Sequence, residues 1–358
     1  MDTVTVRSSQ VRELIDRQLE LFLDAEVERL AFMGADGVAV VRDYLTAFVR
    51  DGGKRLRPSF VYWGHRASGG TDEQLDEVLH AACAVELVHA AALLLDDIMD
   101  EAPSRRGRPA PHVALADLHR RSDWRGEAPR FGESAATLLA LLALAWADAA
   151  LLRTGARLPE ALDILTRLRV EAIGGQYLDL AGTATGAVDA RRAGTISVYK
   201  SAKYTVERPL HLGHAIAGGP PRTRGLLSAY ALPLGEAFQL RDDILGVFGD
   251  PARTGKPAGA DLVQGKATYL LAYARERAGD LAGILDGGHN GHNGHDSGHS
   301  VRAARELIVA CGALDAAEER ISALVAEAIA ALDRIPDIPP DARLELAELA
   351  VLATDRSL

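Results

Sequence analysis

The apolar residues of this chain recur at the spacing of α-helices along most of its length. Near the start, Val11, Leu14 and Ile15 fall on one face with charged residues between, and the same three-to-four spacing indicates helices elsewhere. No segment shows convincing strand alternation, and no internal repeat is found. The helical patterns cover residues 8–50, 71–99, 134–153, 158–181, 193–218, 222–248, 266–285, 300–312, 316–333 and 340–354.

Glycine pairs and polar stretches mark the expected ends of these helices. Gly52-Gly53 ends the first pattern, and Gly174-Gly175 is expected to break the helix that contains it. A basic loop is expected over 103–111 and a polar loop over 120–132. The pattern therefore predicts an all-α fold in a single domain of residues 1–358, with ten or more helices around a deep central cavity.

Composition supports this fold class and limits the functions. Of the 358 residues, 48% are hydrophobic and only 5% aromatic, which favours packed helices over sheets. The net charge of −10 argues against a nucleic-acid partner. The cysteines, Cys83 and Cys311, lie in apolar helical contexts and predict no disulfide. The N-terminus resembles no signal peptide, and the best apolar run, 81–95, is shorter than the roughly 20 residues of a membrane span, so a cytoplasmic protein is expected.

One segment has low complexity. Residues 286–300 contain His289, His292, His295 and His299 among glycines and asparagines. A metal-binding tract is one interpretation. A solvated loop between helices is the preferred one, because glycine and asparagine leave such side chains unorganised.

Two acidic motifs carry the candidate chemistry. The first is Asp96-Asp97-Ile98-Met99-Asp100, and the second begins at Asp242-Asp243 and is followed by Asp250. Asp96 and Asp100 share a helical face, while Asp97 is turned by about 100°. Buried carboxylates are costly unless cations neutralise them, and oxygen ligands suit Mg²⁺ shared with phosphates. A solvated acidic helix end is the alternative, which the apolar residues 93–95 disfavour.

Three basic clusters accompany these acids. Glycines 52 and 53 precede a run of three cations, an arrangement suited to anions but lacking the order of a P-loop. An arginine pair follows the first acidic motif, and guanidinium groups bind phosphate with two hydrogen bonds. Together the clusters predict a pocket for two diphosphates and metal ions that opens onto an apolar cavity. The basic residues are Lys54, Arg55, Arg57, Arg105, Arg106, Lys256 and Lys266.

These motifs, in this order, resemble trans-isoprenyl diphosphate synthases (polyprenyl synthetases), and most closely those that make geranylgeranyl diphosphate. The resemblance rests on GGKRLRP, on DDIMD followed by RRGRP, and on FQLRDD followed by GDP, TGKPAG and GK, from about residue 45 to residue 275. Gly175-Gln176 with Asp179, Lys200-Ser201 and YTVERP at 204–209 also fit. The resemblance implies an isoprenoid synthase-type fold and a homodimer.

The resemblance also implies roles for individual residues. It implies that about three Mg²⁺ ions are bound by Asp96, Asp100 and Asp242, with Asp97 and Asp243 assisting. His89 lies seven residues before Asp96, on the same helical face, and so can reach the same pocket. The implied allylic diphosphate site consists of Arg105, Lys200, Gln239, Lys256 and Lys266, and the implied isopentenyl diphosphate site of Lys54, Arg57, His89 and Arg106.

The implied reaction is magnesium-dependent ionisation, condensation and elimination. An allylic diphosphate (dimethylallyl, geranyl or farnesyl) would lose its diphosphate, and the resulting cation would be attacked by isopentenyl diphosphate. Ala91, Ala92 and Val88 precede the first motif. Their small size predicts a C20 or longer all-trans product, with geranylgeranyl diphosphate preferred. The alternative is that these residues only allow close helix packing.

Some positions depart from the family's pattern. They are Leu95, Ala140-Leu141, Gly246 and Ala260. Two other functions therefore stay open: a class I terpene cyclase and a non-catalytic accessory subunit of a prenyl synthase. Consumption of isopentenyl diphosphate by the chain alone would exclude both.

Overall fold

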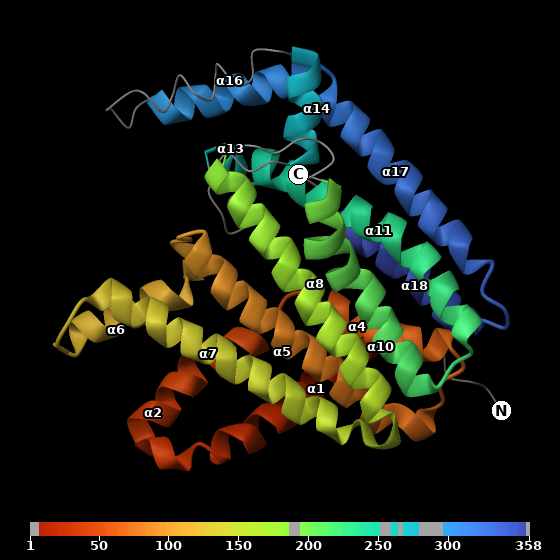
Figure 1. Cartoon of the computed structure of the whole chain (residues 1–358), viewed down its shortest axis with the longest axis horizontal. Helices are drawn as coiled ribbons and strands as arrows, with labels where there is room; N and C mark the ends of the chain where they lie inside the picture. The colour runs from red at the N-terminus through yellow and green to blue at the C-terminus, as the bar shows by residue number, and fades with distance from the viewer. Residues whose placement is uncertain (1–6, 186–193, 251–258, 264–267, 279–295, 356–358) are drawn as a thin grey trace. The chain divides into compact units, whose positions relative to one another are not determined.

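A computed structural model describes residues 7–185, 194–250, 259–263, 268–278 and 296–355 (Figure 1). Within these ranges the chain is almost entirely helical, and its strands form one two-residue antiparallel pair. The predicted all-α, isoprenoid synthase-type fold class is confirmed. The chain divides into two compact units: unit 1 (Met1–Thr166, Arg208–Gly225, Ile335–Leu346) and unit 2 (Arg167–Glu207, Leu226–Arg334, Ala347–Leu358).

Unit 1 is built around the long apolar helix α5 and the helices that pack on it. Its core includes Phe22, Phe60, Trp63, Leu87 and Leu94, all fully buried. The α5 residues from 78 to 88 are buried without interruption, which is why this helix shows no polar face. The elements of unit 1 are α1 (Ser8–Glu28), η1 (Ala31–Met33), α2 (Gly34–Val40), η2 (Val41–Thr46), α3 (Ala47–Arg50), α4 (Leu56–Ala67), η3 (Asp72–Gln74), α5 (Leu75–Met99), β1 (Ser104–Arg105), β2 (Arg108–Pro109), α6 (Pro111–Arg121), α7 (Ala128–Leu151), η4 (Leu152–Arg157) and α10 (Arg208–Ala217).

Helices α4 and α10 lie side by side in unit 1 (Figure 1) because glycines remove the side chains at their crossing. A Cβ atom on Gly64 would lie 2.5 Å from the carbonyl oxygen of Leu210, and one on Gly213 would lie 1.9 Å from that of Val61. Neither distance is possible for a real side chain. The crossing therefore requires glycine at both positions.

The basic loop expected over 103–111 contains a hairpin that the sequence pattern did not reveal. Ser104 pairs with Pro109 and Arg105 with Arg108. The two turn residues have positive φ angles, 53° for Arg106 and 73° for Gly107. Two consecutive positive φ angles are the geometry of a type I′ turn, whose twist matches that of short antiparallel strands. Only two residues pair on each side, too few to produce a readable alternation.

Unit 2 has its own apolar core, to which α11, α14, α16 and α17 contribute. Ile244, Leu271, Ile308 and Leu324 belong to this core and are nearly or fully buried. Three helices, α8, α11 and α18, begin in unit 1 and continue into unit 2. The elements are α8 (Leu158–Thr185), η5 (Ser197–Glu207, a π-helix), α11 (Pro221–Phe248), α13 (Ala260–Val263), α14 (Tyr269–Ala278), α16 (Asp296–Ala310), α17 (Ala313–Leu332) and α18 (Pro340–Thr354).

The expected break at Gly174-Gly175 is wrong, because α8 continues through both glycines. A Cβ atom on Gly175 would lie 2.5 Å from the backbone nitrogen of Lys200, whereas a Cβ on Gly174 would meet nothing within 4 Å. Gly175 therefore serves the close approach of η5 to α8 rather than a turn. The polar loop expected over 120–132 is also shorter than predicted, because α7 begins at Ala128.

Two helical stretches of the described residues are long and apolar enough to cross a membrane by length and composition, Asp72–Met99 and Ala128–Gly182. Of their most apolar windows, 78% and 44%, respectively, are buried inside the protein. Core helices pass the same test, so these stretches are weak evidence for a span. The predicted single domain, central cavity and cytoplasmic location stay predictions.

Candidate active site

The first acidic motif lies at the C-terminal end of α5. Asp96 and Asp97 belong to its last turn, and Asp100 is its C-cap residue. The Asp97 side chain is fully buried, while that of Asp96 is 20% exposed. The C-terminus of a helix carries partial negative charge, so carboxylates there need nearby cations. The motif is therefore an anionic site that depends on positive partners.

Arg105, on strand β1, supplies the nearest positive charge. Its Nε donates to both carboxylate oxygens of Asp97 at 2.7 Å, and its Nη2 lies 2.6 Å from Asp97 and 3.4 Å from Asp96. Burial alone would lower the pKa of Arg105, but the hydrogen bond to Asp97 and the charges of Asp97, Asp96 and Asp100 raise it above its ordinary value. Asp97 is thus paired with Arg105, and Asp96 is the more exposed of the two carboxylates.

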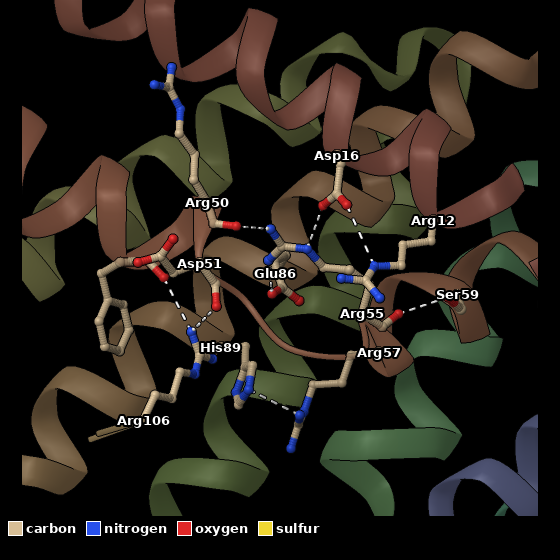
Figure 2. Close-up of polar contacts among 11 residues, drawn as sticks. Arg12, Asp16, Arg50, Asp51, Arg55, Arg57, Ser59, Glu86, His89 and Arg106 are labelled. Carbon is tan, nitrogen blue, oxygen red and sulfur yellow. Dashed lines mark hydrogen bonds and ion pairs between the residues drawn. The ribbon is translucent and has the colours of Figure 1, made fainter. Parts of the chain in front are cut away.

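Arg57 and His89 form a second polar pair in unit 1. Arg57 lies in the first turn of α4, and its Nη1 is 3.1 Å from the Nε2 of His89 on α5 (Figure 2). Burial, and then the positive charges of Arg57, Arg106, Arg105 and Arg55, hold the pKa of His89 well below its usual value. His89 is therefore neutral at pH 7. Its Nε2 accepts from Arg57, and its Nδ1 carries the proton.

Arg106 is positioned by the backbone before α4. Its Nη1 donates to the carbonyl oxygen of Asp51 at 2.9 Å (Figure 2). Its guanidinium lies 5.4 Å from the ring centre of Phe48. Arg108 makes an ion pair with the Asp51 carboxylate at 2.7 Å. Lys54 is exposed in the same turn. Unit 1 therefore contains all the cations predicted for isopentenyl diphosphate.

The middle cation of the basic run, Arg55, is buried, unlike Lys54 and Arg57. Arg55 is 3% exposed, and its guanidinium donates to Asp16 at 2.7 Å and to Glu86 at 2.5 Å. The expectation that all three cations form an anion cradle is wrong for this residue. The sequence signal that could have revealed it is Glu86, an acid within the apolar run of α5 that needs a buried counter-charge.

The second acidic motif lies on α11 in unit 2. Asp243 is 4% exposed and accepts hydrogen bonds from Gln239 Nε2 at 2.8 Å and from the backbone nitrogen of Tyr269 at 3.1 Å. Asp242 is partly exposed. In each motif, then, the second aspartate is buried and accepts hydrogen bonds from a predicted site residue, Arg105 or Gln239, while the first aspartate is partly exposed. On η5, the Lys200 Nζ lies 2.5 Å from Asp179.

Some predicted residues cannot be placed. Lys256, Lys266, His289, His292 and His295 lie outside the described residues, as does the side chain of His299. Of the chain-length residues, Ala91 and Val88 are buried, and Ala92 is partly exposed. Ala92 lies on the same stripe of α5 as His89 and Asp96, because it is three residues after the first and four before the second.

Within the part of the chain that the structure describes, no group of three or more His, Cys, Asp or Glu side chains is arranged to hold a metal ion. Asp96 and Asp100 offer carboxylate oxygens from one turn, which are the donors that Mg²⁺ prefers. The donor chemistry therefore fits magnesium, with further ligands needed to complete the site. Neither cysteine is in a disulfide, and burial raises the pKa of the Cys83 thiol far above its usual value.

Comparisons with known proteins identify the family to which this chain belongs. The polyprenyl synthetase family profile matches residues 38–292. The geranylfarnesyl diphosphate synthase of Aeropyrum pernix is 31% identical over 82% of this chain and 87% of its own length. The geranylgeranyl diphosphate synthase of Methanosarcina mazei is 28% identical over 95% of this chain and 93% of its own.

A solved structure shows the same fold over the full length. It is the geranylgeranyl pyrophosphate synthase of Corynebacterium glutamicum, complexed with isoprenyl diphosphate and magnesium, which is 38% identical with a TM-score of 0.92. The match covers 98% of this chain and 100% of that chain. The family match covers more than half of the sequence, and so the chain belongs to the polyprenyl synthetase family of prenyltransferases.

Proposed function

We propose that this chain condenses isopentenyl diphosphate with an allylic diphosphate (dimethylallyl, geranyl or farnesyl) to give an all-trans prenyl diphosphate of C20 or longer, with geranylgeranyl diphosphate as the preferred product. The observation that carries the proposal is the end of α5 in a polyprenyl synthetase chain. There Asp96 and Asp97 lie against Arg105, and His89 lies two turns earlier against Arg57. Carboxylates suited to metal thus lie on α5, and cations suited to diphosphate contact the same helix.

In this proposal, the chain's own residues bind, orient and protect the reactants. Arg105, and in unit 2 Lys200, would bind the oxygens of the allylic diphosphate and stabilise the charge that develops when the carbon–oxygen bond breaks. Lys54, Arg57, His89 and Arg106 would hold isopentenyl diphosphate. Because His89 is neutral and protonated on Nδ1, it would serve as a hydrogen-bond donor rather than as an acid.

Magnesium would be held by Asp96, Asp100 and Asp242, about three ions by family resemblance. When bound, it neutralises diphosphate oxygens and so makes diphosphate a better leaving group. Asp97 and Asp243 would act differently from these ligands, since one orients Arg105 and the other orients Gln239. Gln239 would then lie beside the allylic chain. Lys256 and Lys266, which the structure does not describe, complete the proposed allylic site.

Small residues on α5 would leave room for the growing hydrocarbon tail. Ala92 is partly exposed on the face that carries Asp96, so it would line the tail's path one turn below the diphosphate. Ala91 and Val88 are buried among neighbouring side chains. Of the predicted chain-length residues, we therefore expect Ala92 to contact the product.

Exposed apolar side chains support the predicted homodimer. In unit 2, Val170, Ile173, Tyr177 and Leu180 are all exposed and recur along α8 at intervals of three and four residues. That spacing forms a continuous apolar stripe, typical of a helix that packs against another. We propose that this stripe packs against a second copy of the chain.

Product analysis tests the proposed function. The chain alone would be incubated with Mg²⁺, isopentenyl diphosphate and each allylic diphosphate in turn, and the products identified by mass. We expect the chain to consume isopentenyl diphosphate, to form geranylgeranyl diphosphate, and to lose its activity when EDTA is added. A cyclic hydrocarbon formed without isopentenyl diphosphate would instead indicate a terpene cyclase. Inactivity of the chain alone, restored by a partner subunit, would indicate an accessory role.

A further inference from the structure

Arg55 is the centre of a buried ion-pair network beside the predicted isopentenyl diphosphate site (Figure 2). Each nitrogen of its guanidinium donates to a different element. Nε donates to Asp16 on α1 at 2.7 Å, Nη1 to Glu86 on α5 at 2.5 Å, and Nη2 to the carbonyl oxygen of Arg50 on α3 at 3.1 Å. Through one side chain, the N-terminus of α4 is thus tied to three other helices of unit 1.

The backbone is shaped to admit this side chain. Arg55 has a φ angle of 51°, a left-handed conformation that non-glycine residues adopt at an energetic cost. A Cβ atom on Gly52 would lie 1.8 Å from the Arg55 Nη1, so only glycine leaves space for the guanidinium. A Cβ atom on the second glycine, Gly53, would meet nothing within 4 Å. The strained residue and the glycine together indicate that the inward path of Arg55 is a required feature.

Two parallel contacts connect α4 to α5. Arg55 contacts Glu86, and Arg57, two residues later, contacts His89, one turn after Glu86 on the same helix. The first contact is buried, since the side chains of Arg55 and Glu86 are 1% and 7% exposed. The second lies at the edge where the predicted substrate would bind. A displacement of the Arg55–Glu86 contact would therefore displace Arg57 relative to His89.

A buried ion pair usually contributes little net stability, because removing both charges from water offsets their attraction. What such a pair supplies is geometry, since each charge has one acceptable place. Arg55 keeps its positive charge here. Burial would lower its pKa, but the charges and hydrogen bonds of Glu86 and Asp16 raise it above its ordinary value.

We propose that Arg55, Glu86 and Asp16 are positioning residues for the isopentenyl diphosphate site, and that they fix the first turn of α4 so that Arg57 and Lys54 meet one diphosphate. This inference rests on the proposed function for the identity of the ligand. The three residues do not touch substrate themselves. Their effect is exerted through Arg57 and its hydrogen bond to His89.

The variant Glu86→Gln tests this inference, because it keeps the size of the side chain and removes its charge. A displacement of about 1 Å in a site can lower the reaction rate by about 100-fold. We expect a comparable loss in substrate binding, so the variant should raise KM for isopentenyl diphosphate by about 10- to 100-fold. KM for the allylic diphosphate should stay within about twofold, since Arg105 is held by Asp97 rather than by this network. A merely structural role would change both constants together.

A binding measurement separates this inference from the proposed function. Isopentenyl diphosphate would be titrated calorimetrically into the full chain in EDTA, which removes the metal-dependent site. We expect Glu86→Gln to bind it more weakly than the wild type by the same factor as in KM. If the wild type bound isopentenyl diphosphate but never consumed it, the proposed function would be wrong, and the binding ratio would still decide the inference.

Two further variants control for folding. Glu26→Gln removes another buried glutamate of unit 1, which pairs with Arg29 and Arg153 rather than with α4. It should lower stability without changing either KM. If Glu86→Gln fails to fold, Asp16→Asn weakens the same guanidinium from its more exposed side, and it should raise KM for isopentenyl diphosphate by a smaller factor. Unchanged affinity in every folded variant, or an equal loss in Glu26→Gln, would overturn the inference.

Discussion

Asp97 and Arg105 form a two-pronged ion pair at the end of α5, in which the Arg105 Nε lies 2.7 Å from both carboxylate oxygens of Asp97. Asp97 is fully buried, whereas Asp96, its neighbour in the chain, remains partly exposed. The two neighbouring carboxylates of the first acidic motif therefore lie in different environments. We propose that the partly exposed Asp96 binds metal, while the buried Asp97 holds Arg105.

Substitutions at the two positions should have different effects. Asp96→Asn should lower kcat by about 100-fold or more, because it removes charge where the leaving diphosphate is stabilised, and leave the free energy of unfolding nearly unchanged. Asp97→Asn should also destabilise the fold, by about 3 kcal/mol, since it leaves Arg105 buried without its counter-charge. Steady-state kinetics and urea denaturation of both variants measure the contrast. Equal stability of the two variants would contradict it.

The glycine pair in α8 offers a matched comparison. Gly175→Ala should destabilise the protein by about 1–3 kcal/mol, because the new Cβ would overlap the Lys200 backbone. Gly174→Ala should instead stabilise it by about 0.5–1 kcal/mol, because alanine is the better helix former and this position is open. Denaturant titrations would give both values. Gly175→Ala should also lower activity through the displacement of Lys200.

Stability should fall in mild acid because of His65. Burial lowers the pKa of His65 to about 4, and the charge of Arg66 acts in the same direction. The hydrogen bond that His65 Nε2 donates to Gln74 Oε1 and the charges of Asp72 and Glu77 oppose this shift. The unfolded chain binds this proton near pH 6.5, so the histidine's contribution is complete above pH 6.5 and is lost as the pH falls toward 4. The loss is about 3 kcal/mol.

Urea denaturation between pH 8 and pH 4 measures this dependence. The variant His65→Gln, which cannot titrate, should show a flatter profile in that window and no difference in slope from the wild type between pH 7 and pH 8. A wild-type and a variant profile that remain parallel throughout would show that other groups account for the acid sensitivity.

Product length should respond to Ala92 more than to Ala91. Ala92→Phe would place a ring on the partly exposed face below Asp96 and should shift the main product to a shorter chain, with one isoprene unit corresponding to about one turn, or 5.4 Å. Ala91→Phe would enter a position that is 1% exposed, so it should chiefly lower stability by about 1–3 kcal/mol. Mass analysis of products gives the answer. Identical products from Ala92→Phe and the wild type would place the tail elsewhere.

The apolar stripe on α8 predicts the oligomeric state. Ile173→Glu combined with Tyr177→Glu places two charges on side chains that are 66% and 68% exposed, so folding should be retained while self-association is lost. Light scattering after gel filtration should change from the mass of two chains to that of one. Leu344→Glu, a comparable exposed site on α18, is the control and should leave the mass unchanged.

The spacing of residues along the chain is enough to predict most of the helices, the fold class and the two acidic motifs, because these depend on local patterns. Apolar residues three and four apart define a helical face regardless of what packs on it, and Asp96 and Asp100 share a face for the same reason. The family also follows from the motifs, since its residues occur in order over much of the chain.

Which charged residues are exposed, and which are buried in ion pairs, depends on contacts between distant parts of the chain. Asp97 and Arg55 are as polar in the sequence as Asp96 and Lys54, yet the first two are buried and paired, and the others are accessible. Their partners lie 8 to 39 residues away along the chain, and no local pattern encodes such a distance. The break that the sequence predicts at Gly175 is absent for the same physical reason: the missing side chain gives space to the Lys200 backbone and does not end its own helix.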